Sequence, residues 1–188
     1  LHVCDQNLEQ IRPEQITSTH NLLVDVCQAA KFEGESITRE YPKYQAKYGD
    51  SPSQICTVLA RSFADIGDIV RGKDLYLGNK KKNQDIREKE KLEIKLKSSF
   101  KQIHSSLEEK EKNHYHGDDP DFFKLREDWW ALNREMVWYA ITCGAGGGTY
   151  FRGTCGSGKT PTQGKCRCEG ANANQVPTYF DYVPQYLR

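Results

Sequence analysis

The sequence predicts a mainly α-helical fold, a helical bundle with a loop-rich, disulfide-tied part at its N-terminal end. Two segments carry apolar residues at alternating spacings of three and four, which is the pattern of one buried stripe along an α-helix. All three tryptophans fall in one of these segments, residues 125–143, and large aromatic side chains dominate core energetics. Seven cysteines in 188 residues indicate disulfides and an oxidising, extracellular compartment.

Composition limits the classes of partner. A chain of 188 residues is long enough for one good-sized core or two small ones. Charged residues make up 28% of the chain, but the net charge is only +1, so overall charge gives no case for a nucleic-acid partner, and we expect none. The sequence has no signal peptide and no run of about 18 apolar residues. We expect a fragment of a longer surface or secreted protein, attached to a membrane only through parts absent from this sequence.

The first 55 residues have a mixed pattern. Residues 21–32 predict a short helix. We expect loops after it, because glycine and proline interrupt longer elements, here at Gly34, Pro42, Gly49 and Pro52. Cys4 and Cys27 are expected to tie this part down.

A regular helix is predicted next. Its apolar stripe has gaps of three, four, three and four and consists of Cys56, Leu59, Phe63, Ile66 and Val70. Asp50, Ser51 or Ser53 can cap its N-terminus, and Pro52 suits the first turn. Gly72 is expected to end it.

Residues 80–112 form a highly charged segment, with 11 Lys or Arg and 7 Asp or Glu. A narrower apolar seam inside it predicts a helix with one packed edge, formed by Leu92, Leu96, Phe100, Ile103 and Leu107. The opening residues 79–91 lack this seam and are expected to form a loop. Residues 113–123 should break the chain, after which Asp118, Asp119 or Asp121 can cap the next helix.

The tryptophan-containing segment predicts the central helix of the core. Its expected buried stripe is Leu125, Trp129, Leu132, Met136, Tyr139 and Cys143. A second row beside it is only partly apolar and consists of Arg126, Trp130, Asn133, Val137 and Ala140. Antiparallel packing on the preceding regular helix would bring Cys56 beside Cys143. We therefore expect a Cys56–Cys143 disulfide.

Residues 144–175 are rich in glycine and polar residues and predict an irregular excursion. Cys166 and Cys168 would point the same way in an extended segment, towards two different partners. Residues 153–160 match the phosphate-binding pattern G-x-x-x-x-G-K-[ST], but Pro161 follows directly, so no helix can present its N-terminus to a phosphate. The match is accidental.

The cysteine spacings favour disulfides over a metal site. Cys143, Cys155, Cys166 and Cys168 lie 12, 11 and 2 residues apart, without the paired C-x-x-C spacing of structural zinc sites. The disulfide candidates are therefore Cys4, Cys27, Cys56, Cys143, Cys155, Cys166 and Cys168.

No set of residues indicates an enzyme. His114 and His116 could ligate a metal, although a solvated loop is the favoured interpretation. No Ser/His/Asp or Cys/His arrangement suggests a nucleophile. We expect no catalytic residues, no metal and no cofactor.

One basic run remains as a candidate binding site. It consists of Lys80, Lys81, Lys82, Arg87, Lys89, Lys91, Lys95, Lys97 and Lys101. One interpretation is a solvated helix face; the other is a surface for sulfated glycans, whose anionic groups lysine and arginine neutralise. The interleaved Glu88, Glu90 and Glu93 weaken the positive field.

Three long segments carry a family resemblance. They are CTVLARSFADIGDIVRGKDLYLGN at 56–79, LREDWWALNREMVWYAITC at 125–143 and VPTYFDYVPQYLR at 176–188. They resemble the alpha-class Duffy-binding-like domain of the Plasmodium falciparum erythrocyte membrane protein one family, which are variant surface adhesins. Near the start, CDQNLEQI and LLVDVCQAAKFEG also fit.

The resemblance implies a largely helical fold in three subdomains. Residues 1–55 would be the loop-rich first subdomain, and residues 56–188 the helical second one, truncated at its C-terminal end. The partner of the odd cysteine is then expected beyond the fragment, or is missing from it.

The resemblance also implies a function: adhesion of infected red cells to host receptors. The expected location is the surface of the infected erythrocyte. Expected partners are a red-cell or endothelial receptor and host antibodies. In rosetting, the ligands would be heparan sulfate, complement receptor one or blood-group glycans. The family offers no fixed motif of binding residues, so the basic candidates rest on charge alone. The alternative is a structural, antigenically variable module that supports a neighbouring binding domain.

Overall fold

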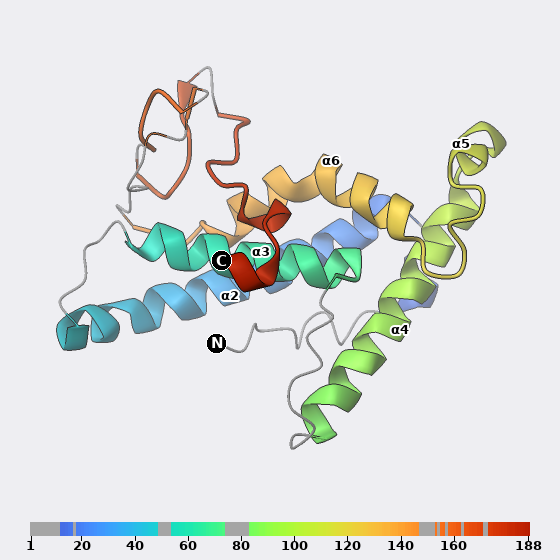
Figure 1. Cartoon of the computed structure of the whole chain (residues 1–188), viewed down its shortest axis with the longest axis horizontal. Coiled ribbons are helices and arrows are strands. Elements are labelled where there is room, and N and C mark those ends of the chain that lie inside the picture. The colour runs from blue at the N-terminus through green and yellow to red at the C-terminus, as the bar shows by residue number, and fades with distance from the viewer. Residues whose placement is uncertain are drawn as a thin grey trace. The chain divides into compact units, whose positions relative to one another are not determined.

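The computed structural model describes residues 12–16, 18–48, 54–73, 83–146, 153, 155–156, 158–162, 164–170 and 173–188, with Tyr44 and residues 83–87 described by their backbone alone. Its helices are η1 (Pro13–Gln15), α2 (Thr19–Tyr48), α3 (Gln54–Arg71), α4 (Asn83–Ser106), α5 (Glu109–His114), α6 (Phe123–Ile141), η3 (Phe180–Tyr182) and η4 (Gln185–Leu187) (Figure 1). The described residues contain no β-strand. The predicted mainly α fold is confirmed.

The chain divides into two compact units. Unit 1 comprises residues 1–4, 27–66 and 134–188, and unit 2 comprises residues 5–26 and 67–133. The division falls within α2, α3 and α6, so each of these helices contributes to both units. The subdomain boundary near residue 55 concerns the whole family domain and stays a prediction. Among the described residues, no helix combines the length and the hydropathy needed to cross a membrane.

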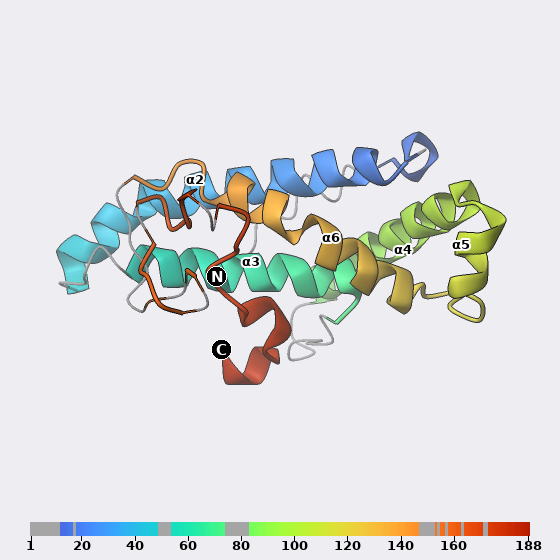
Figure 2. The same ribbon diagram turned by 90° about the horizontal axis from the view of Figure 1, so that it is seen from above.

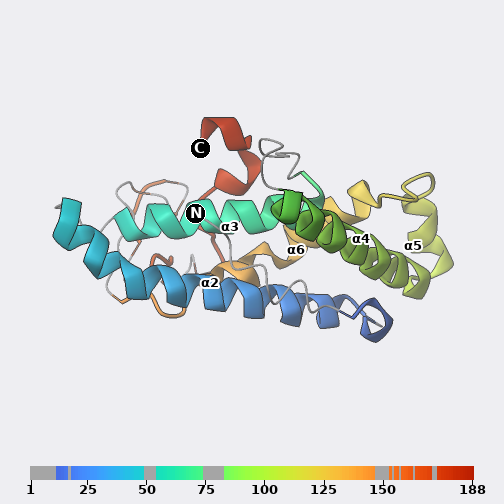
Figure 3. The ribbon, with the colours of Figure 1, turned by 90° about the horizontal axis from the view of Figure 1, so that it is seen from below.

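In unit 1, the second part of α2 runs alongside the first part of α3 (Figures 2 and 3). The predicted stripe of α3 is confirmed: Cys56, Leu59 and Phe63 are fully buried. Phe63 meets the Trp138 ring of α6 edge-on, with ring centroids 5.2 Å apart. Aromatic pairs prefer this geometry because the positive edge of one ring faces the negative face of the other.

The predicted end of the first helix at residue 32 is wrong, because α2 continues through Gly34 and Pro42 to Tyr48. Residues 33–48 were expected as loops. Gly34 lies where α2 approaches the backbone of α6, so that a Cβ at this position would collide with the carbonyl oxygen of Ile141. A buried interhelical contact can thus place glycine inside a helix despite its low propensity. Pro42 lies inside the helix at the cost of one backbone hydrogen bond. Residues 49–53, with the predicted capping residues, lie outside the described part.

The predicted buried stripe of α6 is partly wrong. Leu125 and Trp129 are buried, but Leu132 is 83% exposed, Met136 is 55% exposed and Cys143 is also exposed. The second row is the better buried one, with Arg126, Trp130 and Val137 at 0% exposure. The stripe spans about five turns of 3.6 residues and stays on one side of the helix, so its second part is exposed because packing covers the neighbouring row there, and not because the pattern drifts.

The polar members of the second row have partners. Arg126 Nε donates to the carbonyl oxygen of Val70 at 2.6 Å, and Asn133 Nδ2 donates to that of Trp129 at 2.7 Å. A polar side chain can be buried when it is hydrogen-bonded.

The predicted Cys56–Cys143 disulfide is wrong. Cys56 bonds Cys166 and Cys155 bonds Cys168, while Cys143 is a free, exposed thiol. Cys166 and Cys168 thus have two different partners, as predicted. Cys27 is also free, and Cys4 lies outside the described residues. The Cys56–Cys166 disulfide joins the irregular segment after α6 to the start of α3. Trp138 Nε1 of α6 also donates to the carbonyl oxygen of Cys166, at 3.1 Å.

In unit 2, the seam of α4 is buried as predicted at Leu92, Leu96, Phe100 and Ile103, whereas Leu107 lies beyond the helix and is half-buried. Helix α4 begins at Asn83, so residues 83–91 do not form the predicted loop. Residues 113–123 do break the chain. The side chain of Asp118 accepts hydrogen bonds from the backbone N–H groups of Lys124 and Leu125, both at 2.9 Å. It is one of the three aspartates expected to cap α6.

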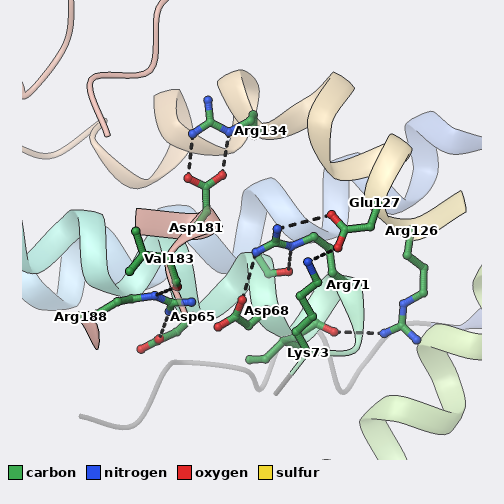
Figure 4. Close-up of polar contacts among 12 residues, drawn as sticks. Asp65, Asp68, Arg71, Lys73, Arg126, Glu127, Arg134, Asp181, Val183 and Arg188 are labelled. Atoms are coloured by element: carbon green, nitrogen blue, oxygen red, sulfur yellow. Dashed lines mark hydrogen bonds and ion pairs between the residues drawn. The ribbon is translucent and has the colours of Figure 1, made fainter. Parts of the chain in front are cut away.

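Buried and half-buried ion pairs fix each unit (Figure 4). In unit 1, Arg134 donates to both oxygens of Asp181 at 2.7 and 2.8 Å, which holds η3 on α6. Arg188 pairs with Asp65 of α3 at 2.8 Å. In unit 2, Arg71 is 1% exposed and pairs with Asp68 at 3.0 Å.

Candidate receptor-binding surface

The exposed side of α4 is the candidate surface in unit 2. The helix is anchored by its apolar seam, where Phe100 meets Trp129 edge-on with ring centroids 6.0 Å apart. At about 100° per residue, the seam occupies one side of the helix and leaves the other to solvent. On this outer side, Ile94 is 64% exposed. The packing of α4 therefore decides which charged residues can meet a ligand.

Lys91, Lys95 and Lys101 fall within an arc of about 120° on that outer side. Lys91 and Lys101 are exposed, and Lys95 is half-buried. We call these three residues the cationic face. A row of lysines along one helix face attracts anions through the sum of their charges.

Glu93 is turned away from the cationic face. Its two carboxylate oxygens accept hydrogen bonds from Arg126 of α6, at 2.7 Å from Nη1 and 2.9 Å from Nη2. Arg126 also donates to the carbonyl oxygens of Val70 and Ile69 at the end of α3. This bidentate pair is of the strong, directional kind. One of the acidic residues that weakened the field in the sequence is thereby neutralised.

The other basic candidates lie elsewhere. Lys97 forms an ion pair with Asp121, which reduces its availability to a ligand. Lys89 is exposed but lies about 160° around the helix from Lys91. Arg87 belongs to the first turns of α4, where only the backbone is described, and Lys80, Lys81 and Lys82 lie outside the described residues.

The histidine-containing turn after α5 forms a polar cluster. His114 Nε2 lies 3.8 Å from Asp128, and Tyr115 Oη donates to the same carboxylate at 3.0 Å. Burial, and the hydrogen bond to Asp128, raise the pKa of Tyr115 to about 12. His116 is exposed. Among the described residues, no group of three or more His, Cys, Asp or Glu is placed to hold a metal ion.

The phosphate-loop pattern is occupied by a disulfide-linked turn. Cys155 and Thr160 pair as an isolated antiparallel bridge, and Cys155 is bonded to Cys168. The described residues directly after Thr160 are not helical. The geometry that cradles a phosphate at a helix N-terminus is therefore missing here.

Sequence reasoning missed the Arg126–Glu93 pair, although a signal existed. Arg126 shares its row with Trp130 and Val137, at spacings of four and seven residues. A charged residue in line with large apolar residues predicts a buried ion pair when an acidic partner is in reach. The row was discounted because it was only partly apolar.

Comparisons with known proteins identify the family. The family model described as the Duffy binding domain matches residues 1–188. A search of the curated proteins finds no match. Among solved structures, the chain is similar to the NTS-DBL1(alpha-1) domain of the membrane protein PfEMP1 from the varO strain of Plasmodium falciparum, with 44% identity and a TM-score of 0.78. That match covers 99% of this chain and 40% of the other.

Two further structures are similar. The NTS-DBL1-alpha and CIDR-gamma double domain of PfEMP1 from the same strain is 44% identical, with a TM-score of 0.77, over 99% of this chain and 25% of that one. The ICAM-1-binding DBLbeta domain of PfEMP1 IT4var13 is 31% identical, with a TM-score of 0.68, over 99% and 39%. This chain therefore spans at most about 40% of these solved chains. It belongs to the Duffy binding domain family, whose PfEMP1 members are adhesion modules and not enzymes.

Proposed function

We propose that this chain is part of an extracellular adhesin domain that binds a host-cell receptor through an anionic glycan, with heparan sulfate as the ligand class. The cationic face of α4 is the proposed contact surface. The related IT4var13 domain, described as ICAM-1-binding, supports the general role of a receptor-binding module. Because the chain spans about 40% of its relatives, the activity of the complete domain is part of the proposal. The proposed location is the surface of the infected erythrocyte, where host antibodies could also reach it.

The pairing of Glu93 with Arg126 is the observation that carries this proposal. The pair neutralises a carboxylate that would otherwise lower the positive potential at the cationic face. Arg126 is fully buried, so it contributes little charge to the surface itself. The lysines at 91, 95 and 101 are thus left with less opposing charge than the sequence suggests.

The size of the effect can be bounded. An exposed charge pair contributes about 0.2–1 kcal/mol, so three lysines facing sulfate groups would contribute about 0.6–3 kcal/mol. A change of 1.4 kcal/mol is tenfold in affinity. Arg87 and Lys80–Lys82 precede the cationic face in sequence and could extend it, whereas Lys89 and Lys97 contribute less.

Retention on immobilised heparin tests the proposal. A Lys91→Gln, Lys95→Gln, Lys101→Gln variant should elute at clearly lower salt than the unmodified chain. The matched control carries Lys31→Gln, Lys43→Gln and Lys159→Gln, which remove the same three charges from exposed positions of unit 1. The control should elute near the salt concentration of the unmodified chain.

Two outcomes would count against the proposal. Equal losses of retention in the α4 variant and the control would indicate that only net charge matters. Retention of the unmodified chain no greater than that of a neutral protein would exclude an anionic glycan as the ligand. The latter result would favour a structural and antigenically variable module that supports a neighbouring binding domain. Red-cell binding with and without soluble heparin then tests a role in rosetting.

A further inference from the structure

Unit 2 contains a cavity of about 360 Å³ where η1 leads into α2. Ligand pockets range from about 300 to 1,000 Å³, so this one suits a single ring rather than a chain. Its lining includes a cation, a carboxylate, two amides and two apolar side chains: Arg12, Asp25, Gln15, Asn21, Ile16 and Val24. Neither the candidate surface nor any ion pair described above uses these side chains.

The cavity belongs to the same unit as the cationic face. Helix η1, which contributes Gln15, contacts α4 directly. The cavity therefore lies beside an element that packs on α4.

Two charged groups in the cavity are available to a ligand. Among the described residues, neither the guanidinium of Arg12 nor the carboxylate of Asp25 has a hydrogen-bond or ion-pair partner. Arg12 is exposed, whereas Asp25 is half-buried. Partial burial raises the pKa of Asp25 above its ordinary value, because a charge in a less polar environment is disfavoured.

We propose that this cavity binds one acidic monosaccharide unit, a sugar ring that carries a single carboxylate. The inference rests in part on the proposed function, since the unit would belong to the same anionic glycan. The planar fork of Arg12 matches a carboxylate with two parallel hydrogen bonds. Asp25 accepts hydrogen bonds from ring hydroxyls, which are donors, and the amides of Gln15 and Asn21 can donate and accept.

The same residues select against other ligands. Ile16 is 3% exposed and Val24 is 63% exposed, so they offer a buried and an open apolar contact to the C–H groups of a ring. A neutral sugar would leave Arg12 without an anion. A sugar with a second anionic group would meet the Asp25 carboxylate, and like charges at close range repel. The predicted preference is therefore for one carboxylate with free hydroxyls.

Ligand-observed NMR with the full chain and glucuronic acid as the probe tests this inference. Glucose is the neutral comparison, and glucuronic acid 2-sulfate, which carries a second anionic group beside its carboxylate, is the sulfated one. We expect glucuronic acid to bind at least about tenfold more tightly than either. Arg12→Gln should lower its affinity about tenfold or more, as expected for the loss of a charge-assisted hydrogen bond, and Asp25→Asn should reduce the discrimination against the sulfated sugar. The matched control, Arg61→Gln, removes an exposed arginine of α3 and should change nothing.

The results separate this inference from the proposed function. The Lys91, Lys95 and Lys101 variant should elute from heparin at lower salt and keep its affinity for glucuronic acid. Unchanged binding in Arg12→Gln, or equal binding of glucose and glucuronic acid, would overturn the pocket while leaving the cationic face untouched. Loss of glucuronic acid binding in Arg61→Gln to the same extent as in Arg12→Gln would also overturn it.

Discussion

Gly34 marks a close approach of α2 and α6 in unit 1. A Cβ at residue 34 would lie 2.8 Å from the carbonyl carbon of Ile141 and closer still to its oxygen. Both are backbone atoms, which cannot rotate away as a flexible side chain can. The position therefore requires glycine for space, although it lies inside a helix.

Gly34→Ala should destabilise the protein. Helix propensity alone favours alanine by about 1 kcal/mol, but overpacking costs about 1–3 kcal/mol and sometimes more. Because the obstacle is backbone, we expect a net loss of about 2 kcal/mol in the free energy of unfolding, measured in urea. Gly146→Ala is the control, since nothing lies within 4 Å of its Cβ position. Equal stability of both variants would contradict the close contact.

Cys27 provides a test that depends on pH. Burial raises the pKa of its thiol to about 11, and only the thiolate reacts rapidly with alkylating reagents. At pH 8, we expect iodoacetamide to label exposed Cys143 first and Cys27 slowly, with the rate at Cys27 rising about tenfold per pH unit towards 11. Mass spectrometry of the labelled peptides measures both rates.

The same shift has a consequence for stability. The folded state raises the pKa of Cys27, so the contribution of this thiol to the free energy of unfolding is fully present below the ordinary thiol pKa of about 8.5. It is lost as the pH rises through about 11, because the unfolded chain releases the proton at lower pH. A Cys27 that reacts as fast as Cys143 at pH 8 would exclude its burial.

Helix α6 illustrates which face of an amphipathic helix is buried. Leu125 is 5% exposed and Leu132 is 83% exposed, although both belong to the stripe with 3.5-residue spacing. Leu125→Ala should lower the free energy of unfolding by about 2–5 kcal/mol. Leu132→Ala should change it by less than about 0.5 kcal/mol. Thermal or urea unfolding of the two variants decides the matter, and a larger loss in Leu132→Ala would reverse the assignment of the faces.

The elements that sequence predicted well have strong local periodicity. In α3 every stripe residue is apolar, so counting at spacings of three and four was sufficient for Cys56 through Val70. In α6 the buried row includes Arg126, whose burial depends on Glu93 of a different helix. No pattern within residues 125–143 contains that partner.

The failures in α2 and in the disulfides have the same origin. Gly34 and Pro42 end helices when local propensity decides, but α2 continues through both. At Gly34 the close packing on Ile141 explains the glycine. The sequence predicted a Cys56–Cys143 bond because antiparallel packing would bring the start of one helix beside the end of the other. Its actual partner, Cys166, lies in an irregular segment whose path no periodicity describes. The cationic face is a similar case. Its lysines were evident from the sequence, but the neutralisation of Glu93 by Arg126 of another helix was not.

At the scale of the whole molecule, the disulfides differ in the length of chain that they close. Cys56 and Cys166 are 110 residues apart, and Cys155 and Cys168 are 13 apart. A loop of about 100 residues predicts about 4.7 kcal/mol of stabilisation and one of about 15 residues predicts about 3 kcal/mol. Replacing the first pair by serine should therefore cost about 1.5 kcal/mol more than replacing the second, in denaturant unfolding. A greater loss on removing Cys155 and Cys168 would contradict this order.

The residues that identify the family and those proposed to bind a ligand are largely different. The segments at 56–79 and 125–143 supply buried packing residues such as Phe63 and Trp130. They preserve the fold that this chain has in common with domains 44% and 31% identical to it. The cationic face lies between those segments, on α4, where charge and not packing determines the residue.

The salt dependence of affinity for a heparin oligosaccharide tests the cationic face most directly. Each neutralised anionic group contributes about 0.7–0.9 to the slope of log affinity against log salt concentration in nucleic acids. We predict that Lys91→Gln, Lys95→Gln and Lys101→Gln together reduce this slope by about 2, whereas the Lys31, Lys43 and Lys159 control leaves it unchanged. An unchanged slope in the α4 variant would contradict the assignment of the binding surface to α4.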